Sequence, residues 1–417
     1  MTNKNNIQKG YKDSAIGIIP EEWDVKRLVD LCYNTGYYGI NAPAVTYCDS
    51  LPTYLRITDI DNYGKFIKTN KVSVNHPDSA KFILKDNDIV FARTGATVGK
   101  TYLYNPNDGL LVYAGFLICF SINTQKAISY YVKTYTDTST YWNWVKIISQ
   151  RSGQPGINAI EFSSIQLPIP PLEEQRKIAE ILETWDEAIE KQSKLIEKLE
   201  LRKRGIMQRL LTGRTRLSGF NTPWLKRRMK DCFEHITDTS NGCEYLPMTI
   251  SARLGLISQK DKFDRVIAGD SLKKYTHIQK GDFAYNKGNS NLYEMGCIYR
   301  LKEQDAVVPF VYICFRPKQN VIGEFYRHFF INHGLDRQLK RIITSGARGD
   351  GLLNVDKTDF FELEIVYPPI AEQKAIAEVL TAADNEIATH RKMLEALRQQ
   401  KRGLMQQLLT GKTRVKI

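Results

Sequence analysis

The sequence predicts an α+β protein, with two mixed α/β domains and two long helices that pair as an antiparallel coiled coil. A segment of 48 residues occurs twice without a gap, at 170–217 and 368–415, and 24 of its positions are identical. Each copy has helical periodicity, whereas the segment before each copy mixes short apolar strands with Gly-rich turns. The repeat therefore predicts one module, a domain followed by a long helix, used twice with a pseudo-two-fold relation.

These repeats divide the chain into four parts. With 417 residues, the chain is too long for one ordinary hydrophobic core. We expect a first domain at 1–169 followed by a first helix at 170–217. A second domain at 218–367 and a second helix at 368–417 complete the chain.

The two predicted helices have clear start and stop signals. Pro170-Pro171 and Pro368-Pro369 precede them, and Gly213 and Gly411 follow them. Between these ends, apolar residues recur with spacings of four and three, which is typical of a coiled-coil seam. The predicted seam consists of Ile178, Leu182, Trp185, Ile189, Ile196, Leu199, Ile206 and Leu210 in the first copy, and of Ile376, Leu380, Ala383, Ile387, Leu394, Leu397, Leu404 and Leu408 in the second.

Two seam positions are polar in both copies. They are Gln192 with His390, and Lys203 with Lys401. Polar seam residues lower stability but fix register and partner. Trp185 in the first copy corresponds to Ala383 in the second, which suggests a large residue packed against a small one across the seam. Pairing the two helices with each other is the simplest way to bury both seams, and it would hold the two domains at opposite ends. Pairing of each helix with another protein is the alternative.

The two domains share a weaker common plan. Each has, in order, a Pro-Trp phrase, a strand led by Asp, an apolar strand, an aromatic and basic helix, and a Gly-rich loop. In the first domain these features lie at 19–32, 88–93, 110–120, 128–148 and 151–158, and in the second at 222–232, 282–287, 306–315, 323–343 and 344–354. The order recurs while most residues differ, which suits one scaffold carrying two different binding surfaces.

Composition narrows the class of protein. No apolar run reaches the ~18 residues of a membrane helix, and the polar first residues lack a signal-peptide core. We therefore expect a cytoplasmic protein without a membrane partner. The seven cysteines form no CxxC pair and are interpreted as buried reduced thiols. His328 and His333 are five apart, the wrong spacing for one helical face, so we expect no metal site.

The charge pattern favours a polyanionic partner. The net charge of +13 is spread along the chain without a basic tail. Both domains combine Tyr with Arg, Lys, Asn and Gln, which contact phosphates and base edges in nucleic-acid complexes. The candidate DNA-binding residues are Arg56, Arg93, Lys100, Arg151 and Gln154 in the first domain, and Arg253, Asn286, Lys287, Asn289, Lys340, Arg341 and Arg348 in the second. For each one taken singly, a solvated side chain or a phosphate contact is the competing interpretation.

Common catalytic motifs are missing. The segment RTGATVGKT at 93–101 places only three residues between Gly95 and Gly99, one too few for a phosphate-binding loop. The segment VYPPI at 366–370 has Tyr where adenine amino-methylation requires Asn or Asp. A P-loop enzyme is therefore rejected, and the chain is expected to have no catalytic residues.

The repeated motifs identify a family. PPLEEQRKIAEIL with RGIMQRLLTG, and PPIAEQKAIAEVL with RGLMQQLLTG, occur in register at one offset, and each domain opens with a Pro-Trp phrase. Across essentially its whole length, the chain resembles the DNA-specificity (S) subunit of type I restriction–modification systems.

This resemblance implies a function. Such subunits carry two target-recognition domains, and each domain reads one half of a bipartite, asymmetric double-stranded DNA site. The conserved helices set the spacer between the half-sites. Two modification (methyltransferase) subunits dock on the conserved regions and hold S-adenosylmethionine, and restriction subunits join the full complex. The S subunit is not catalytic; it directs adenine methylation and DNA cleavage by its partners. The alternative is a coiled-coil scaffold that links two protein-interaction domains and has no role on DNA.

Overall fold

The structure is a computed structural model that describes residues 9–239, 245–263, 269–288, 293–302, 304–343 and 353–416. It divides into two compact units. Unit 1 comprises Met1–Ser193 and Met393–Ile417, and unit 2 comprises Lys194–Lys392. The division cuts across both long helices, so each unit contains one domain and a part of each helix.

Unit 1 is built on two four-stranded sheets. The first has the order β4-β11-β8-β9 and is antiparallel throughout. The second has the order β10-β6-β7-β5, with β10 parallel to β6. Short pairs β1-β2 and β12-β3 lie outside these sheets. The strands are β1 (Tyr11–Lys12), β2 (Ile19–Pro20), β3 (Asp24–Arg27), β4 (Tyr37–Tyr38), β5 (Ala44–Thr46), β6 (Thr53–Leu55), β7 (Val72–Val74), β8 (Asp88–Ala92), β9 (Thr101–Leu103), β10 (Leu111–Tyr113), β11 (Leu117–Ser121) and β12 (Gln166–Ile169).

Unit 2 repeats the first sheet and varies the second. The order β14-β21-β18-β19 is again antiparallel. In the other sheet, β16-β15-β20-β17, the parallel neighbours are β15 and β20. The strands are β13 (Leu225–Arg228), β14 (Phe233–Ile236), β15 (Leu246–Ser251), β16 (Gly255–Ser258), β17 (Thr276–Ile278), β18 (Phe283–Asn286), β19 (Cys297–Arg300), β20 (Ala306–Val308), β21 (Ile313–Pro317) and β22 (Glu364–Tyr367), and β13 pairs with β22.

The prediction of a single apolar strand in each domain is wrong. Each apolar run forms two strands that belong to different sheets, β10 and β11 in unit 1, and β20 and β21 in unit 2. A tight turn separates them, with Leu117 N donating to Ala114 O at 2.8 Å and Tyr312 N donating to Pro309 O at 3.0 Å. Each run can be apolar along its whole length because it passes through both sheets of its unit.

The aromatic and basic helix predicted in each domain is also broken in two. In unit 1, Thr138 caps the second helix by accepting a hydrogen bond from Tyr141 N. In unit 2, His333 has a φ of +60°, and a Cβ on Gly334 would lie 2.5 Å from the Phe329 ring, so the chain turns there. The short helices are α1 (Ser129–Tyr135), α2 (Ser139–Ile148), α3 (Ala159–Ser163), α5 (Met229–Cys232), α6 (Gln259–Phe263), α7 (Gly323–Ile331), α8 (Asp336–Ile342) and α9 (Lys357–Glu362), with 3-10 turns η1 (Leu28–Leu31), η2 (Ile57–Asp59), η3 (Ser79–Phe82), η4 (Gly95–Thr97), η5 (Pro106–Asp108) and η6 (Gly269–Lys274).

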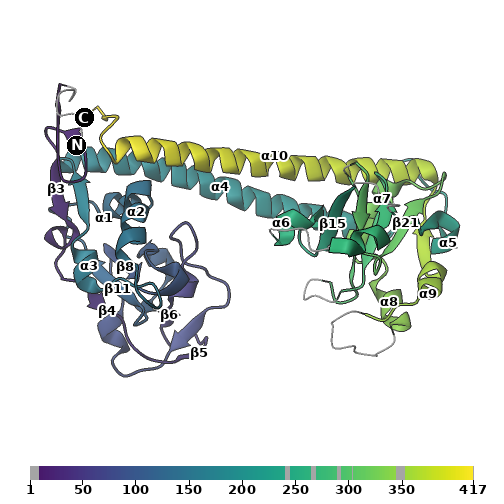
Figure 1. Cartoon of the computed structure of the whole chain (residues 1–417), viewed down its shortest axis with the longest axis horizontal. Helices are drawn as coiled ribbons and strands as arrows, with labels where there is room; N and C mark the ends of the chain where they lie inside the picture. The colour runs from purple at the N-terminus through teal and green to yellow at the C-terminus, as the bar shows by residue number, and fades with distance from the viewer. Residues whose placement is uncertain are drawn as a thin grey trace. The chain divides into compact units, whose positions relative to one another are not determined.

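The two long helices are α4 (Leu172–Leu210) and α10 (Ile370–Leu408), each of 39 residues. Inside unit 1 the start of α4 packs against the end of α10, and inside unit 2 the start of α10 packs against the end of α4 (Figure 1). The core of unit 1 contains Ile178 and Leu182 with Met405, Leu408 and Leu409. The core of unit 2 contains Met207, Leu210 and Leu211 with Ile376, Ala377 and Leu380. The predicted α+β class with an antiparallel helix pair is confirmed.

Most described cysteines are buried, as expected. Cys119, Cys232, Cys297 and Cys314 are buried and unpaired, and burial raises the pKa of the Cys232 and Cys297 thiols to about 11. Cys48 is exposed, which corrects the expectation for that thiol, and Cys243 lies outside the described residues. Within the described ranges, no helix combines the length and the apolar character needed to cross a membrane.

Candidate nucleic-acid interface

A Trp–Glu–Arg cluster around a buried Glu closes each unit where its long helix begins. In unit 1, Arg414 donates to both oxygens of Glu174 at 2.6 and 2.9 Å, and Trp23 Nε1 donates to Glu174 Oε2 at 3.0 Å. Glu174 is fully buried, and the Arg414 guanidinium lies 6.0 Å from the Trp23 ring centroid. The hydrogen bonds that Arg414 donates to this carboxylate raise the pKa of Arg414. Both hydrogen-bond donors are needed because an unpaired carboxylate is costly to bury.

Unit 2 contains the same cluster from equivalent residues. Arg216 donates to both oxygens of Glu372 at 2.6 Å, and Trp224 Nε1 donates to Glu372 Oε2 at 2.8 Å. Glu372 is fully buried, and the Arg216 guanidinium lies 5.4 Å from the Trp224 ring centroid. Gly213 and Gly411 both have a φ of +70°, which ends each long helix. Each cluster Arg lies three residues after one of these glycines.

The Gln after each buried Glu ties the helix start to the domain. Gln175 accepts from Ile128 N at 2.9 Å and donates to Pro170 O at 2.9 Å. Gln373 accepts from Ile322 N at 3.0 Å and donates to Pro368 O at 2.8 Å. Ile128 and Ile322 are the N-cap residues of α1 and α7. The Glu-Gln dipeptide of each repeat therefore fixes the helix start against one short helix of its own unit.

In each unit a seam Lys of one helix pairs with an Asp of the facing helix, and in unit 2 the pairs Arg202–Glu386 and Arg391–Glu200 also join the two helices. Lys401 of α10 donates to Asp186 of α4 at 2.6 Å in unit 1, and Lys203 of α4 pairs with Asp384 of α10 in unit 2. Burial alone would raise the pKa of Asp384, but hydrogen bonds from Lys203 and Arg327 outweigh it and lower this pKa. The polar seam lysines thus meet acids of the facing helix, a device that can specify register.

The predicted seam residues differ in burial. Burial does not follow distance from the domains alone, since Ile196, Leu199 and Ile387 lie near the helix middles and are buried. Ile178, Leu182, Ile196, Leu199, Leu210, Ile376, Leu380, Ala383, Ile387 and Leu408 are buried, whereas Trp185, Ile189, Ile206, Leu394, Leu397 and Leu404 are half-buried. The expected packing of Trp185 against Ala383 is wrong. Trp185 adjoins the Asp186–Lys401 pair in unit 1, and Ala383 adjoins the Asp384–Lys203 pair in unit 2.

Two arginines among the unit 1 candidates are held by carboxylates of their own unit. Arg56 donates to both oxygens of Asp59 at 2.8 and 2.7 Å, which raises the pKa of Arg56. Arg151 donates to both oxygens of Glu161 at 2.6 and 2.7 Å. Lys100 donates to Asn62 Oδ1 at 2.8 Å. These pairs hold the loops that contain them and leave fewer donors for a ligand.

Arg93 and Gln154 are placed differently. The Arg93 guanidinium lies 5.0 Å from the Tyr38 ring centroid, and no carboxylate of the described residues pairs with it. Gln154 is exposed, and its amide nitrogen lies 2.9 Å from where a Cβ on Gly95 would be. The bridge between Thr94 and Gly156 brings the two loops together, so Arg93 and Gln154 share one surface of unit 1.

The unit 2 candidates are more scattered. Arg253 is exposed in the turn between β15 and β16, and Lys340 and Arg341 are exposed at the end of α8. Asn286 ends β18 and accepts from Gly288 N at 2.9 Å. Burial and the neighbouring Lys357 lower the pKa of Lys287. Asn289 and Arg348 lie outside the described residues.

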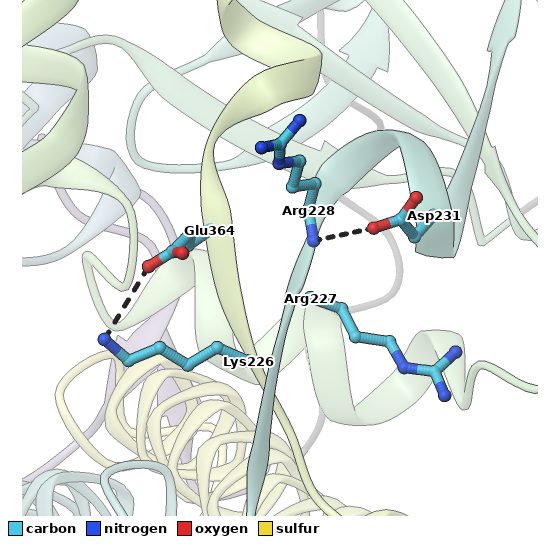
Figure 2. Close-up of a pocket in the computed structure, with 5 residues that line it drawn as sticks. All are labelled: Lys226, Arg227, Arg228, Asp231 and Glu364. Atoms are coloured by element: carbon cyan, nitrogen blue, oxygen red, sulfur yellow. Dashed lines mark hydrogen bonds and ion pairs between the residues drawn. The ribbon is translucent and has the colours of Figure 1, made fainter.

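A charged pocket of about 500 Å³ lies on the β13–β22 pair of unit 2. Figure 2 shows Lys226 reaching Glu364 and the Arg228 backbone donating to Asp231. The Arg228 side chain donates to Glu362 at 2.6 Å. The Arg227 guanidinium stacks 4.2 Å from the Tyr367 ring centroid. Most of these cations are paired, so the pocket is an ion-paired surface and not an open anion site.

Comparison with known protein families shows which family the chain belongs to. A family model described as type I restriction modification DNA specificity domain matches residues 20–201 and 267–399. The chain belongs to this specificity-subunit family.

Named relatives extend over nearly the whole chain. A Methanocaldococcus jannaschii protein named as the MjaX specificity subunit of a type I restriction enzyme is 27% identical, over 98% of each chain. The EcoKI specificity subunit of Escherichia coli K12 is 25% identical, over 87% of this chain and 82% of its own.

Solved structures agree on the fold. The type I restriction–modification S subunit from M. genitalium covers 98% of this chain and 99% of its own, with a TM-score of 0.55 and 13% identity. A chain from a study of assembly and conformational transition of the type I R-M system covers 95% and 99%, with a TM-score of 0.56 and 16% identity.

Within this specificity-subunit framework, the sequence interpretation missed the Trp–Glu–Arg clusters. Glu174, Glu372, Arg216 and Arg414 are identical in the two repeats, and Trp23 and Trp224 stand in the Pro-Trp phrases. The recurrence of these residues in both repeats could have indicated a shared structural role. Sequence spacing alone, however, does not show that residues up to 392 positions apart are in contact, as Glu22 and Arg414 are in their ion pair. Among the described residues, no group of three His, Cys, Asp or Glu side chains is arranged to hold a metal ion.

Proposed function

We propose that the chain is the sequence-specific DNA-binding subunit of a type I restriction–modification complex. Each unit reads one half of a bipartite, asymmetric site in double-stranded DNA, and α4 and α10 set the spacer between the half-sites. Two modification subunits dock on the helices and the adjoining clusters and bind S-adenosylmethionine, and restriction subunits complete the assembly. The chain itself is not catalytic; it directs adenine methylation and cleavage by its partners in the cytoplasm.

The observation that carries this proposal is one scaffold used twice with different surfaces. Both units contain the Trp–Glu–Arg cluster, the Glu-Gln tie and an antiparallel sheet of the same order. The candidate surfaces differ, with Arg93 and Gln154 in unit 1 and Arg253, Lys340 and Arg341 in unit 2. A repeated frame suits two identical partners, and unlike surfaces suit two different half-sites.

Selection from a random duplex pool tests the proposal. The chain would be purified in complex with the modification subunits of its own system and incubated with the pool at moderate salt. We expect a consensus of two short, unlike blocks separated by a spacer of fixed length and free sequence, with affinity that falls as salt rises. A complex that shows no preference among random duplexes would overturn the proposal and favour the protein-linking scaffold.

A further inference from the structure

Three strand ends lie in a row at one edge of the first sheet of unit 1. Gly39, just after β4, donates from its N to Leu117 O at 3.0 Å, and Arg93, just after β8, donates from its N to Phe116 O at 3.0 Å. Helix α3 adjoins the same edge, because Ala159 N donates to Tyr38 Oη at 3.1 Å. Figure 1 shows β4, β11, β8 and α3 gathered within this unit. We call the residues Tyr38, Arg93, Phe116, Gln154 and Ile160 the Arg93 face.

Arg93 is fixed in orientation while its donors stay available. The Tyr38 ring is held by the bond from Ala159, and the guanidinium lies over that ring with its carbon 5.0 Å from the centroid. Stacking on a ring fixes the plane of a guanidinium and leaves its N–H groups free at the edge. Arg56 and Arg151 differ, since carboxylates already occupy their N–H groups.

The rest of the Arg93 face is apolar or neutral. Phe116 is 56% exposed and Ile160 is 82% exposed. Gln154 adds an exposed amide beside Gly95. The acid nearest to Ile160 in the chain, Glu161, is paired with Arg151. One open guanidinium among exposed apolar side chains resembles a base-edge reader more than a phosphate site, which gathers several cations.

We infer that the Arg93 face reads base edges in the half-site of unit 1, with Arg93 on a guanine and Phe116 on the methyl group of a thymine. This inference rests on the proposed function. The planar fork of Arg matches the O6 and N7 acceptors of guanine, and an aromatic side chain fits the thymine methyl. Arg93 N donates to Phe116 O at 3.0 Å, so the two residues lie opposite each other on neighbouring strands. We therefore expect the guanine and the thymine within one or two base pairs of each other, at a rise of ~3.4 Å per pair.

Duplex selection with variants of the full-length chain, in complex with its modification subunits, tests the inference. Arg93→Ala and Arg93→Lys are expected to lose the preference for one G·C pair in one block only, and Phe116→Ala to lose the preference for a neighbouring T. The block read by unit 2 acts as an internal reference. Arg27→Ala is the matched control, because Arg27 is an exposed unit 1 arginine paired with Asp30, and its consensus is expected to stay unchanged.

Modified bases give a second, independent measurement. Replacing the assigned guanine by 7-deazaguanine removes the N7 acceptor and should weaken wild-type binding roughly tenfold. Replacing the assigned thymine by uracil removes one methyl group and should weaken it about fourfold. The Arg93→Ala variant should be insensitive to the first replacement, and the Phe116→Ala variant to the second.

The outcomes separate the inference from the proposed function. A wild-type bipartite consensus that persists unchanged in Arg93→Ala, with or without a uniform loss of affinity, overturns the inference and leaves the proposed function standing. Absence of any wild-type consensus overturns the proposed function itself. Loss of one block position in Arg93→Ala, with the circular dichroism spectrum of the wild type, supports the inference.

Discussion

Arg216 and Arg414 each neutralise a carboxylate that is shielded from water. Glu372 and Glu174 are fully buried, and each receives two hydrogen bonds from its Arg and one from a Trp. Charge-assisted bidentate bonds of this kind are strong and directional. A buried ion pair adds little net stability over an apolar replacement, but losing one partner is costly because the other charge remains buried.

Truncating Arg216 should therefore destabilise unit 2. We expect Arg216→Ala to lower the free energy of unfolding clearly more than a surface substitution does, because Glu372 is buried and would retain only the Trp224 donor. Urea denaturation followed by tryptophan fluorescence measures this change. Arg214→Ala is the control, since Arg214 is exposed two residues earlier. Equal stability of the two variants would contradict a structural role for the cluster.

His328 is a second buried polar residue with an incomplete set of partners. Its Nε2 lies 2.9 Å from Arg327 Nη2, and its Nδ1 has no partner among the described residues. Burial, then the positive charge of Arg327, lowers the pKa of His328 to about 3. Asp384, Lys203 and Glu324 also face the ring. His328 is therefore neutral in the folded chain at neutral pH.

The depressed pKa of His328 predicts acid sensitivity. The unfolded state binds a proton near pH 6.5 and the folded state only near pH 3, so stability is complete above pH 6.5 and falls as pH falls through this window. Between pH 7.5 and 5.0, wild type should lose about 2 kcal/mol more than His328→Leu. Urea denaturation at both pH values measures the difference. Parallel losses in the two proteins would show that His328 does not carry the effect.

At the scale of elements, each helix end is held by its own domain as well as by the facing helix. Ile178 and Leu182 belong to the same core as Trp23 and Phe162, and Ile376 and Leu380 belong to the core of Phe325. The seam residues nearest each helix start, Ile178 and Leu182 in α4 and Ile376 and Leu380 in α10, are therefore fully buried. A Lys–Asp pair lies at this contact in each unit, and in unit 2 two more exposed ion pairs, Arg202–Glu386 and Arg391–Glu200, join the helices.

The Lys401–Asp186 pair should contribute to register and stability. We expect Lys401→Met to cost about 1–3 kcal/mol, because Asp186 would keep only the hydrogen bond from Tyr130. Combining it with Asp186→Asn should cost less than the sum of the single changes, as residues in contact are coupled. Denaturant unfolding of the four proteins in this cycle measures the coupling.

An exposed neighbour provides the control for the seam pair. Arg402 pairs with Glu395, and the two side chains are 66% and 51% exposed. Such surface pairs contribute under about 1 kcal/mol, so Arg402→Met should be close to neutral. A loss in Arg402→Met as large as that in Lys401→Met would indicate a general effect on the helix.

At the scale of the whole molecule, each unit is closed by the end of the other module's helix. In unit 1, Trp23 and Glu174 of the first module meet Arg414 from the end of the second. In unit 2, Trp224 and Glu372 of the second module meet Arg216 from the end of the first. The repeated phrase at the two helix ends thus has the same structural role in both units.

The spacer role proposed for the helices predicts a length effect. Inserting four residues between Ser193 and Lys194, and four between Lys392 and Met393, keeps the contacts inside each unit and lengthens each helix by about 6 Å. The preferred spacer should grow by one or two base pairs at ~3.4 Å each. Duplex selection measures the spacer, and an insertion in α4 alone serves as the mismatched control. An unchanged spacer after the matched insertions would contradict the spacer role.

Patterns that depend on local spacing were predictable. The Pro-Pro starts, the Gly stops and the heptad spacing predicted both long helices, because these signals act within a few residues of the chain. The broken elements were not predictable in this way. An apolar run such as 110–120 looks like one strand, and only the turn at Ala114–Leu117 assigns its halves to two sheets.

The candidate site shows the same division. The sequence singled out arginines by type and by neighbouring glycines, but it could not separate Arg93 from Arg56 and Arg151. That separation depends on which carboxylate or ring each side chain meets: Asp59 for Arg56, Glu161 for Arg151 and Tyr38 for Arg93.

The sequence by itself was enough to predict the duplication, the two long helices and the family, because each of these depends on the order and spacing of residues along the chain. The tertiary structure alone decided how the modules close on each other and which cations stay open to a ligand. Those outcomes depend on contacts between residues hundreds of positions apart, such as Glu174 with Arg414, and on the burial that makes a charge need a partner.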